Sequence, residues 1–179
     1  MATAANIIII ILEAIGFRLS YQRGRWKIIF FYTQISNMIS LLSSVLFLLA
    51  GDNAAWLRYT ANCMLTMTFF VSLCILVPMG AGFQKMMLTN SGLFHHTLSP
   101  ILSLVSYILW EKHASVWFVP VALTFVYGMT MLYLNWREKV DGPYPFFRIR
   151  QQSRLATILW MAALTCVIAL ISASIILLT

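Results

Sequence analysis

One hydroxyl and two neighbouring imidazoles are the side chains in this sequence best suited to chemistry. Thr33 lies in the run Phe-Tyr-Thr-Gln-Ile-Ser-Asn, and His95 and His96 are adjacent in Leu-Phe-His-His-Thr-Leu-Ser-Pro. A threonine hydroxyl becomes a nucleophile when a base removes its proton, and a neutral imidazole can do this near neutral pH. The amide of Gln34 or Asn37 would supply a donor to a developing oxyanion. These residues predict an acyl-transfer site, with a simply hydrogen-bonded histidine as the alternative.

Polar residues recur at helical spacing around these candidates. Residues three, four or seven apart share one helix face, so each set predicts a stripe turned away from lipid. Close helix packing alone explains the serines, but it explains a carboxylate, an amide and an imidazole less well. Ser36 and Ser99 are therefore candidate polar supports of the site. The stripes are Asn6, Glu13 and Ser20; Thr33, Ser36, Asn37, Ser40 and Ser44; Arg58, Asn62 and Thr66; and His96, Ser99, Ser103 and Ser106.

Helix phase separates the two histidines. Adjacent residues point about 100° apart on an α-helix, and only His96 continues into Ser99 and the stripe beyond it. Pro100 has no N–H, so the carbonyl four residues back, that of His96, is expected to be free. His96 is the preferred general base, and His95 stays a candidate.

The composition requires that membrane helices position these residues. Of 179 residues, 61% are apolar and only 9% are charged, far fewer than in a soluble domain. We predict an all-α integral membrane protein, one domain over 1–179, built as a six-transmembrane-helix bundle with short loops. No basic leader or cleavage site marks the first run as a signal peptide, so we expect it to remain a helix. The predicted helices are about 4–19, 26–50, 55–80, 92–110, 115–136 and 155–178.

Basic residues gather in alternate connections. The segments 20–26, 81–91 and 137–154 hold most of the twelve Lys and Arg. The positive-inside rule then predicts that these loops are cytoplasmic and that both termini lie on the opposite side. The net charge of +7 indicates contact with anionic lipid head groups, and not nucleic-acid binding, which needs a basic face on a soluble domain.

This topology puts the candidate nucleophile and base at one depth. Thr33 lies about six residues beyond Lys27, roughly 9 Å along a helix, and His96 about four residues beyond Gly92, roughly 6 Å. No metal or other cofactor is expected. His113 is too far along the chain from His96, and His95 and His96 diverge. Three scattered cysteines, Cys63, Cys74 and Cys166, form no ligand motif.

Three short motifs occur in an order that resembles a known family. They are Phe31 to Asn37 (aromatic-Thr-x-x-Ser-Asn), His96 to Pro100 (HxxxP), and Gly142-Pro143-Tyr144-Pro145-Phe146; Arg25-Trp26-Lys27 precedes them. Together they resemble the membrane threonine hydrolases related to the androgen-induced protein and the androgen-dependent tissue-factor-pathway-inhibitor-regulating protein, including small prokaryotic relatives.

The resemblance implies an activity and two catalytic side chains. Members of that family cleave fatty acid esters of hydroxy fatty acids within the membrane through one threonine and one histidine. Carried over, the threonine is Thr33. In the animal proteins the histidine stands five residues before the proline, which selects His95 here. In the prokaryotic type the spacing is that of the HxxxP motif, which selects His96. The expected protein is thus a lipid esterase with a fatty acid ester as substrate.

Several alternatives stay open at this point. A non-catalytic lipid-binding, transport or regulatory membrane protein is the rival function. Glu13 would either orient the histidine as the third member of a triad or pair with Arg18. The basic residues Arg23, Arg25 and Arg148 would either hold the substrate carboxylate or serve only as topology anchors.

Overall fold

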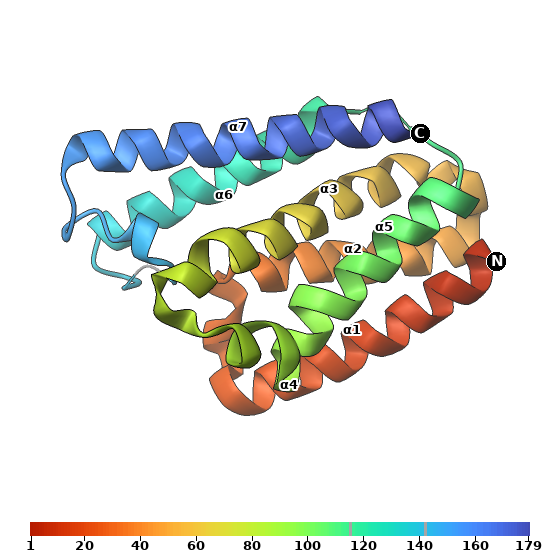
Figure 1. The fold of residues 1–179 in the computed structure, drawn as a ribbon, viewed down its shortest axis with the longest axis horizontal. Helices are drawn as coiled ribbons and strands as arrows, with labels where there is room; N and C mark the ends of the chain where they lie inside the picture. The colour runs from red at the N-terminus through yellow and green to blue at the C-terminus, as the bar shows by residue number, and fades with distance from the viewer. Residues whose placement is uncertain (115, 142) are drawn as a thin grey trace.

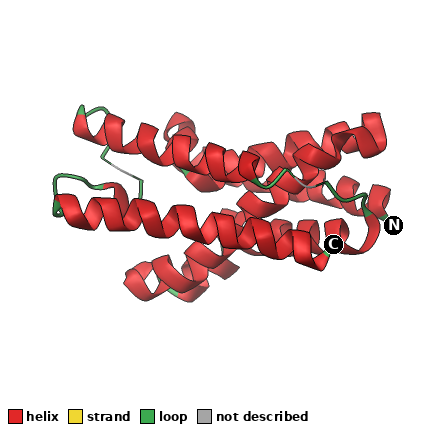
Figure 2. Cartoon of the chain, turned by 90° about the horizontal axis from the view of Figure 1, so that it is seen from above, coloured by secondary structure: helices red, strands yellow, loops and turns green. Residues whose placement is uncertain are grey.

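The computed structural model describes residues 1–114, 116–141 and 143–179, and no strand occurs among them (Figure 2). The expected all-α fold is confirmed. Six helices make up most of the chain, and short 3₁₀ and π segments connect or extend them. The six are α1 (Ala2–Gly24), α2 (Tyr32–Ala50), α3 (Ala55–Val71), α5 (Ser99–Trp110), α6 (Phe118–Trp136) and α7 (Arg154–Leu178).

Five described stretches are long and apolar enough to cross a membrane. They are Ala2–Phe30, Tyr32–Ala81, Asn90–Trp110, Phe118–Trp136 and Arg154–Leu178. The second stretch is 50 residues long and includes two helices, because the chain reverses between α2 and α3 (Figure 1). Gly51 makes this reversal with a φ of 55°, a conformation that glycine adopts without steric cost. These stretches are consistent with a membrane protein.

Helix α3 lies at the centre of the bundle. It packs against α2, α5, α6 and α7, while α1 covers the outer sides of α2 and α5 (Figure 1). Every residue from Arg58 to Thr68 is buried, as expected of a helix with neighbours all round. Both termini lie at one end of the bundle, together with the turn between α2 and α3 (Figure 1).

The predicted polar stripes of the first three segments are confirmed as inward faces. Their members are all buried: Asn6, Glu13, Ser20, Thr33, Ser36, Asn37, Ser40, Ser44, Arg58, Asn62 and Thr66. In the fourth segment Ser99, Ser103 and Ser106 are buried as expected, but the buried histidine is His95 and not His96. The expected phase of the two histidines was therefore wrong.

A π-helix causes this change of phase. The segment η5 (Leu93–Leu98) has π geometry and leads directly into α5. His95 and Ser99 are four residues apart, a spacing that also shares a face on an α-helix, and the longer π turn aligns these two residues further while it turns His96 away from that face. Ser99 donates its backbone N–H to Phe94, five residues back.

The same π register changes which carbonyl lacks a partner. Pro100 has no N–H, and it stands five residues after His95, while the N–H of Ser99 is already used. The freed carbonyl is thus that of His95, where the α-helical pattern predicted His96. Asn37 supplies the missing donor, with its Nδ2 3.4 Å from the His95 oxygen.

Several predicted boundaries need correction. Helix α1 continues to Gly24, so most of the expected loop 20–26 is helical. The expected second helix is not continuous. It begins as the 3₁₀ segment η1 (Arg25–Phe30), and the extended backbone of Phe31 separates this segment from α2. The expected third helix changes at Ser72 to the π segment η3 (Ser72–Ala81), which includes Pro78.

The remaining boundaries lie in the connections. After η3 the chain forms η4 (Gln84–Leu88) and the short α4 (Asn90–Gly92), where a loop was expected from 81 to 91. The fifth predicted helix starts at Ser115, which lies outside the described residues, and α6 begins at Phe118. Gly142 of the Gly-Pro-Tyr-Pro-Phe motif also lies outside them. The end of that motif forms the 3₁₀ turn η6 (Pro145–Phe147).

An ion pair in the core links four helices at the end where the termini lie. Arg58 donates to Glu111 through Nε at 2.8 Å and through Nη2 at 2.9 Å. The other N–H groups of Arg58 donate to serines of α2 and α5, and Asn6 of α1 and Ser106 donate to Glu111. Both charged side chains are almost fully buried. Every N–H of the guanidinium has a partner, as a buried arginine requires.

Candidate active site

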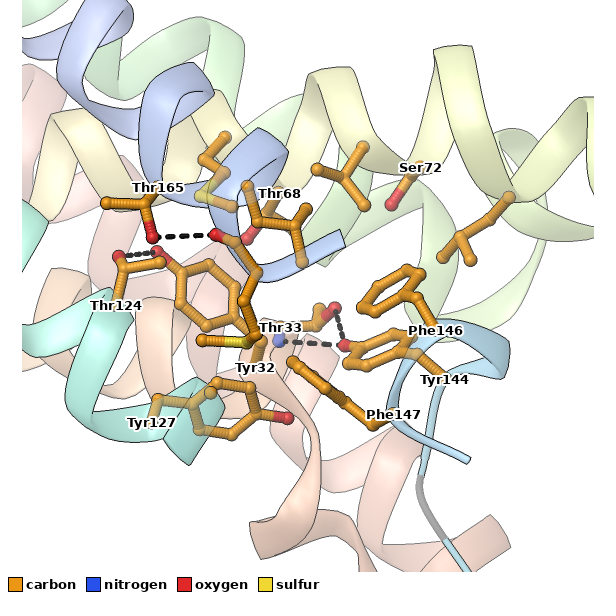
Figure 3. A pocket seen from close by; sticks show the side chains of 16 residues that line it. Tyr32, Thr33, Thr68, Ser72, Thr124, Tyr127, Tyr144, Phe146, Phe147 and Thr165 are labelled. Carbon is orange, nitrogen blue, oxygen red and sulfur yellow. Dashed lines mark hydrogen bonds between the residues drawn. The ribbon is translucent and has the colours of Figure 1, made fainter. Parts of the chain in front are cut away.

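A pocket with a free volume of about 30 Å³ lies where α2, α3, α6 and α7 meet η6 (Figure 3). Its wall is largely apolar and aromatic, with Tyr127, Phe146 and Phe147 among the lining residues. Thr33 and Ser72 are among the hydroxyl side chains that line it, together with Thr68, Thr124 and Thr165. An apolar wall with few polar groups is typical of a site for a small apolar ligand.

Thr33 enters this pocket from the first turn of α2. Its backbone N–H donates to the hydroxyl of Tyr144 at 3.3 Å, and its Oγ1 lies 3.2 Å from the same hydroxyl (Figure 3). First-turn N–H groups have no partner within their own helix. The extended backbone of Phe31 starts the helix at this point. Tyr144 therefore caps α2 and holds the threonine side chain.

Tyr144 comes from the connection between α6 and α7. Its ring stacks on Phe146 with centroids 5.2 Å apart and meets the edge of Phe31 at 5.9 Å. Burial raises the pKa of the Tyr144 hydroxyl above its ordinary value of 10, more than its bonds to Thr33 lower it. The phenol therefore stays protonated near neutral pH and can donate a hydrogen bond.

His96 reaches the same pocket through Ser72. Its Nδ1 lies 2.6 Å from Ser72 Oγ, at the junction of α3 and η3. Among the described residues, Ser72 is the one whose side-chain hydroxyl contacts an imidazole nitrogen. A nucleophile and base need hydrogen-bond contact of this kind.

Ser72 was not among the site residues predicted from the sequence. The signal available was its spacing, four residues after Thr68, at the end of the third apolar segment. That spacing becomes informative once α2 and α3 are known to be antiparallel, with Ser36 Oγ 2.8 Å from Thr68 Oγ1. Thr33 and Ser72 then lie on the same side of this contact, toward the same end of the helix pair.

His95 lies apart from this pocket, between α1, α2 and α5. Gln34 donates through Nε2 to His95 Nδ1 at 3.1 Å and also to Ser20 Oγ at 3.1 Å. The proton of the neutral ring is therefore on Nε2, which faces Glu13 Oε2 at 3.5 Å. Glu13 thus lies beside the buried histidine. Arg18 is exposed and forms no ion pair with Glu13 in the described part of the chain.

The predicted site residues fall into two groups. Thr33 lies with Tyr144, while Gln34 and Glu13 gather around His95. No hydrogen bond joins Thr33 to either histidine in the part of the chain that the structure describes. The catalytic pairing of Thr33 with a histidine stays a prediction.

The proposed supporting residues are engaged elsewhere. The amide of Asn37 donates to the Thr33 carbonyl at 2.6 Å, and the amide of Gln34 donates to Ser20 and His95. Ser36 Oγ donates to the Thr33 carbonyl at 3.0 Å. Ser99 Oγ is buried and has no hydrogen-bond partner among the described residues.

The three arginines considered for substrate binding are on the surface. Arg23 in the last turn of α1, Arg25 at the start of η1 and Arg148 just after η6 are all exposed. Arg148 borders a polar surface hollow with Glu138 and Asp141. Within residues 1–114, 116–141 and 143–179, no three His, Cys, Asp or Glu side chains gather as metal ligands would.

Comparisons with known proteins identify no relative. No protein-family model matches the chain, and no curated protein or solved structure matches it.

Proposed function

We propose that this protein is an intramembrane hydrolase that cleaves esters of fatty acids, such as fatty acid esters of hydroxy fatty acids. One observation carries the proposal: the 2.6 Å contact between His96 Nδ1 and Ser72 Oγ at an apolar pocket that Thr33 also lines. The fatty acid ester as substrate comes from the resemblance of the short motifs to membrane threonine hydrolases.

His96 acts as the base and then as the acid in this mechanism. Nδ1 removes the proton of Ser72 Oγ while that oxygen bonds to the ester carbonyl carbon. The tetrahedral intermediate collapses, the bond to the alkoxy oxygen breaks, and His96 gives its proton to that oxygen. Water then attacks the acyl-serine with the same base and releases the fatty acid and free Ser72.

Tyr144 and Thr33 stabilise the oxyanion. The Tyr144 oxygen accepts the N–H of Thr33 at 3.3 Å, which leaves the phenolic proton to be donated into the pocket. Thr33 Oγ1 lies 3.2 Å from the same oxygen, and when Thr33 donates to it the phenolic proton of Tyr144 is free for the oxyanion. Preorganised donors in a site without water are usually the largest contribution to such catalysis.

The choice between Ser72 and Thr33 as nucleophile follows from the contact with the base. The resemblance implies Thr33, whereas the geometry favours Ser72, which contacts the imidazole directly. Both hydroxyls line one pocket, so the proposed function is the same for either. The experiment below distinguishes them.

An apolar groove supports a substrate with acyl chains. It runs between α6 and α7 and includes Phe125, Met129 and Ile158. Met161 and Thr165 line both this groove and the pocket. An acyl chain lying in this groove would therefore be separated from the pocket only by shared side chains such as Met161.

The proposed arrangement in the bilayer has six spanning helices. Helices α2 and α3 would cross separately within the 50-residue stretch, in addition to the other four stretches. The basic connections would lie in the cytoplasm, with both termini on the opposite side. The pocket is then close to the cytoplasmic interface, where water reaches an acyl intermediate.

A labelling experiment tests the activity. The purified protein is treated with a fluorophosphonate probe and, separately, with a fatty acid ester of a hydroxy fatty acid. The variants are Ser72→Ala, Thr33→Ala, His96→Ala and His95→Ala, with Thr130→Ala as the matched control. Thr130 is an exposed α6 residue whose hydroxyl bonds only within its helix.

We expect labelling and hydrolysis in the wild type and in Thr130→Ala, and neither in Ser72→Ala. His96→Ala should lose at least about a hundredfold in rate. A label located on Thr33 by mass spectrometry, with an active Ser72→Ala variant, would transfer the nucleophile to Thr33 and keep the function. A folded wild type that is neither labelled nor active would reject the hydrolase in favour of non-catalytic lipid binding.

A further inference from the structure

Glu13 is a carboxylate in the middle of the bundle, and the described residues give it no partner of the opposite charge beyond the neutral His95 ring 3.5 Å away. It lies on α1 opposite α2 and α5, and its exposed fraction is 0%. Neither Oε1 nor Oε2 has a hydrogen-bond partner among the described residues. A carboxylate in such a place is costly unless a cation or hydrogen bonds compensate it.

Other unpartnered oxygens surround it. The hydroxyls of Ser40 on α2 and Ser99 on α5 face the Glu13 carboxylate. Both are fully buried, and neither has another partner in the described structure. Three helices thus turn carboxylate and hydroxyl oxygens toward one interface.

The described side chains provide no compensating cation. Arg58 uses every N–H group on Glu111 and serines, and its charge is already matched by Glu111. His95 is neutral when its Nδ1 accepts from Gln34, and its Nε2 is 3.5 Å from Glu13 Oε2. The charge of Glu13 is therefore unmatched by any of these side chains.

We propose that Glu13, Ser40 and Ser99 form a binding site for a monovalent alkali cation, with Na⁺ as the occupant. Hard cations prefer carboxylate, hydroxyl and carbonyl oxygens. One carboxylate balances a single positive charge, whereas a divalent ion would leave an excess charge in the core. A proton on Glu13 would satisfy one neighbouring oxygen, while a metal cation satisfies several together. Comparable ions are held at discontinuous helices in membrane transporters.

The site is separate from the proposed catalytic pocket and does not rest on that function. It joins α1 to α2 and α5, and the π segment η5 ends at Leu98, immediately before Ser99. Bound Na⁺ would stabilise the packing of α1 on the bundle. We therefore expect the folded protein to gain stability with sodium concentration.

The test compares sodium with an organic cation at constant ionic strength. The full chain is purified in detergent with N-methylglucamine chloride, which NaCl then replaces stepwise while thermal unfolding is followed. Binding of radioactive sodium is measured in parallel. The variants are Glu13→Gln, Ser40→Ala and Ser99→Ala. Glu138→Gln, which removes an exposed carboxylate, is the matched control.

In the wild type and Glu138→Gln we expect a saturable rise in Tm and saturable sodium binding. Glu13→Gln should lose both, and each serine variant should raise the sodium Kd about tenfold. Absence of sodium binding by the folded wild type would overturn the proposal, as would unchanged binding in Glu13→Gln. If Glu13→Gln does not fold, an unchanged Kd in both serine variants overturns it. A Tm that follows pH and not sodium would identify a proton as the occupant, which also overturns it.

Discussion

His95 packs directly against Gly16 of α1. A Cβ atom built on Gly16 would lie 2.2 Å from His95 Nε2, far inside any van der Waals contact. Phe17, the next residue, meets the imidazole edge-on with centroids 4.9 Å apart. A glycine is needed at this point because the ring occupies the space of a side chain.

Replacing Gly16 by Ala should destabilise the protein. Overpacking costs about 1–3 kcal/mol, and the gain in helix propensity returns at most about 1 kcal/mol. Thermal unfolding in detergent measures the difference. Ala14→Leu is the control, because it adds volume to the same helix at an exposed position and should change the stability by less than about 0.5 kcal/mol. Equal stability of the two variants would contradict this packing.

Breaking the ion pair of Arg58 and Glu111 should lower the free energy of unfolding strongly. Arg58→Met leaves a buried carboxylate without its partner and should cost about 3–5 kcal/mol. The exposed pair of Arg150 and Glu138, 50% and 69% exposed, is the natural comparison. Glu138→Gln should cost less than about 1 kcal/mol. Chemical unfolding of the variants in mixed micelles measures both, and similar losses would show that burial does not set the energy of the core pair.

Tyr144 should affect catalysis more than stability if the proposed mechanism is right. Tyr144→Phe removes the donor to the oxyanion, and kcat for ester hydrolysis should fall about 10²–10³-fold with little change in KM. Tyr59→Phe removes a hydroxyl that donates to Ser172 O at 2.9 Å outside the pocket and serves as control. An equal fall in kcat for both variants would mean that the loss reflects general damage to the bundle.

The proposed sidedness predicts which loops can be labelled from outside the cell. Lys112→Cys lies in the connection near the termini, and Lys139→Cys lies in a basic connection at the other end. In a background with Cys63, Cys74 and Cys166 changed to Ala, an impermeant maleimide should label Lys112→Cys on intact cells. Lys139→Cys should react only after permeabilisation. The reverse result would invert the orientation.

Much of the architecture could be predicted from local pattern. The apolar runs predicted helices, and the spacing of Thr33, Ser36 and Asn37 predicted one buried face, because an α-helix repeats every 3.6 residues. The same repeat predicted the wrong member of the pair His95 and His96 on the buried face. There a π-helix changes the repeat, and with it the buried histidine and the carbonyl freed by Pro100.

The candidate pocket depended on contacts that no local pattern specifies. Thr33 and Tyr144 are 111 positions apart, and Ser72 and His96 are 24 apart. The sequence showed that hydroxyl and imidazole side chains are present. It also predicted that Thr33 and the histidines lie on polar helix faces at a similar depth in the membrane. Which hydroxyl meets which imidazole was decided only when α3 packed antiparallel to α2 and the π segment turned His96 toward Ser72, because side-chain distances between helices depend on packing and register.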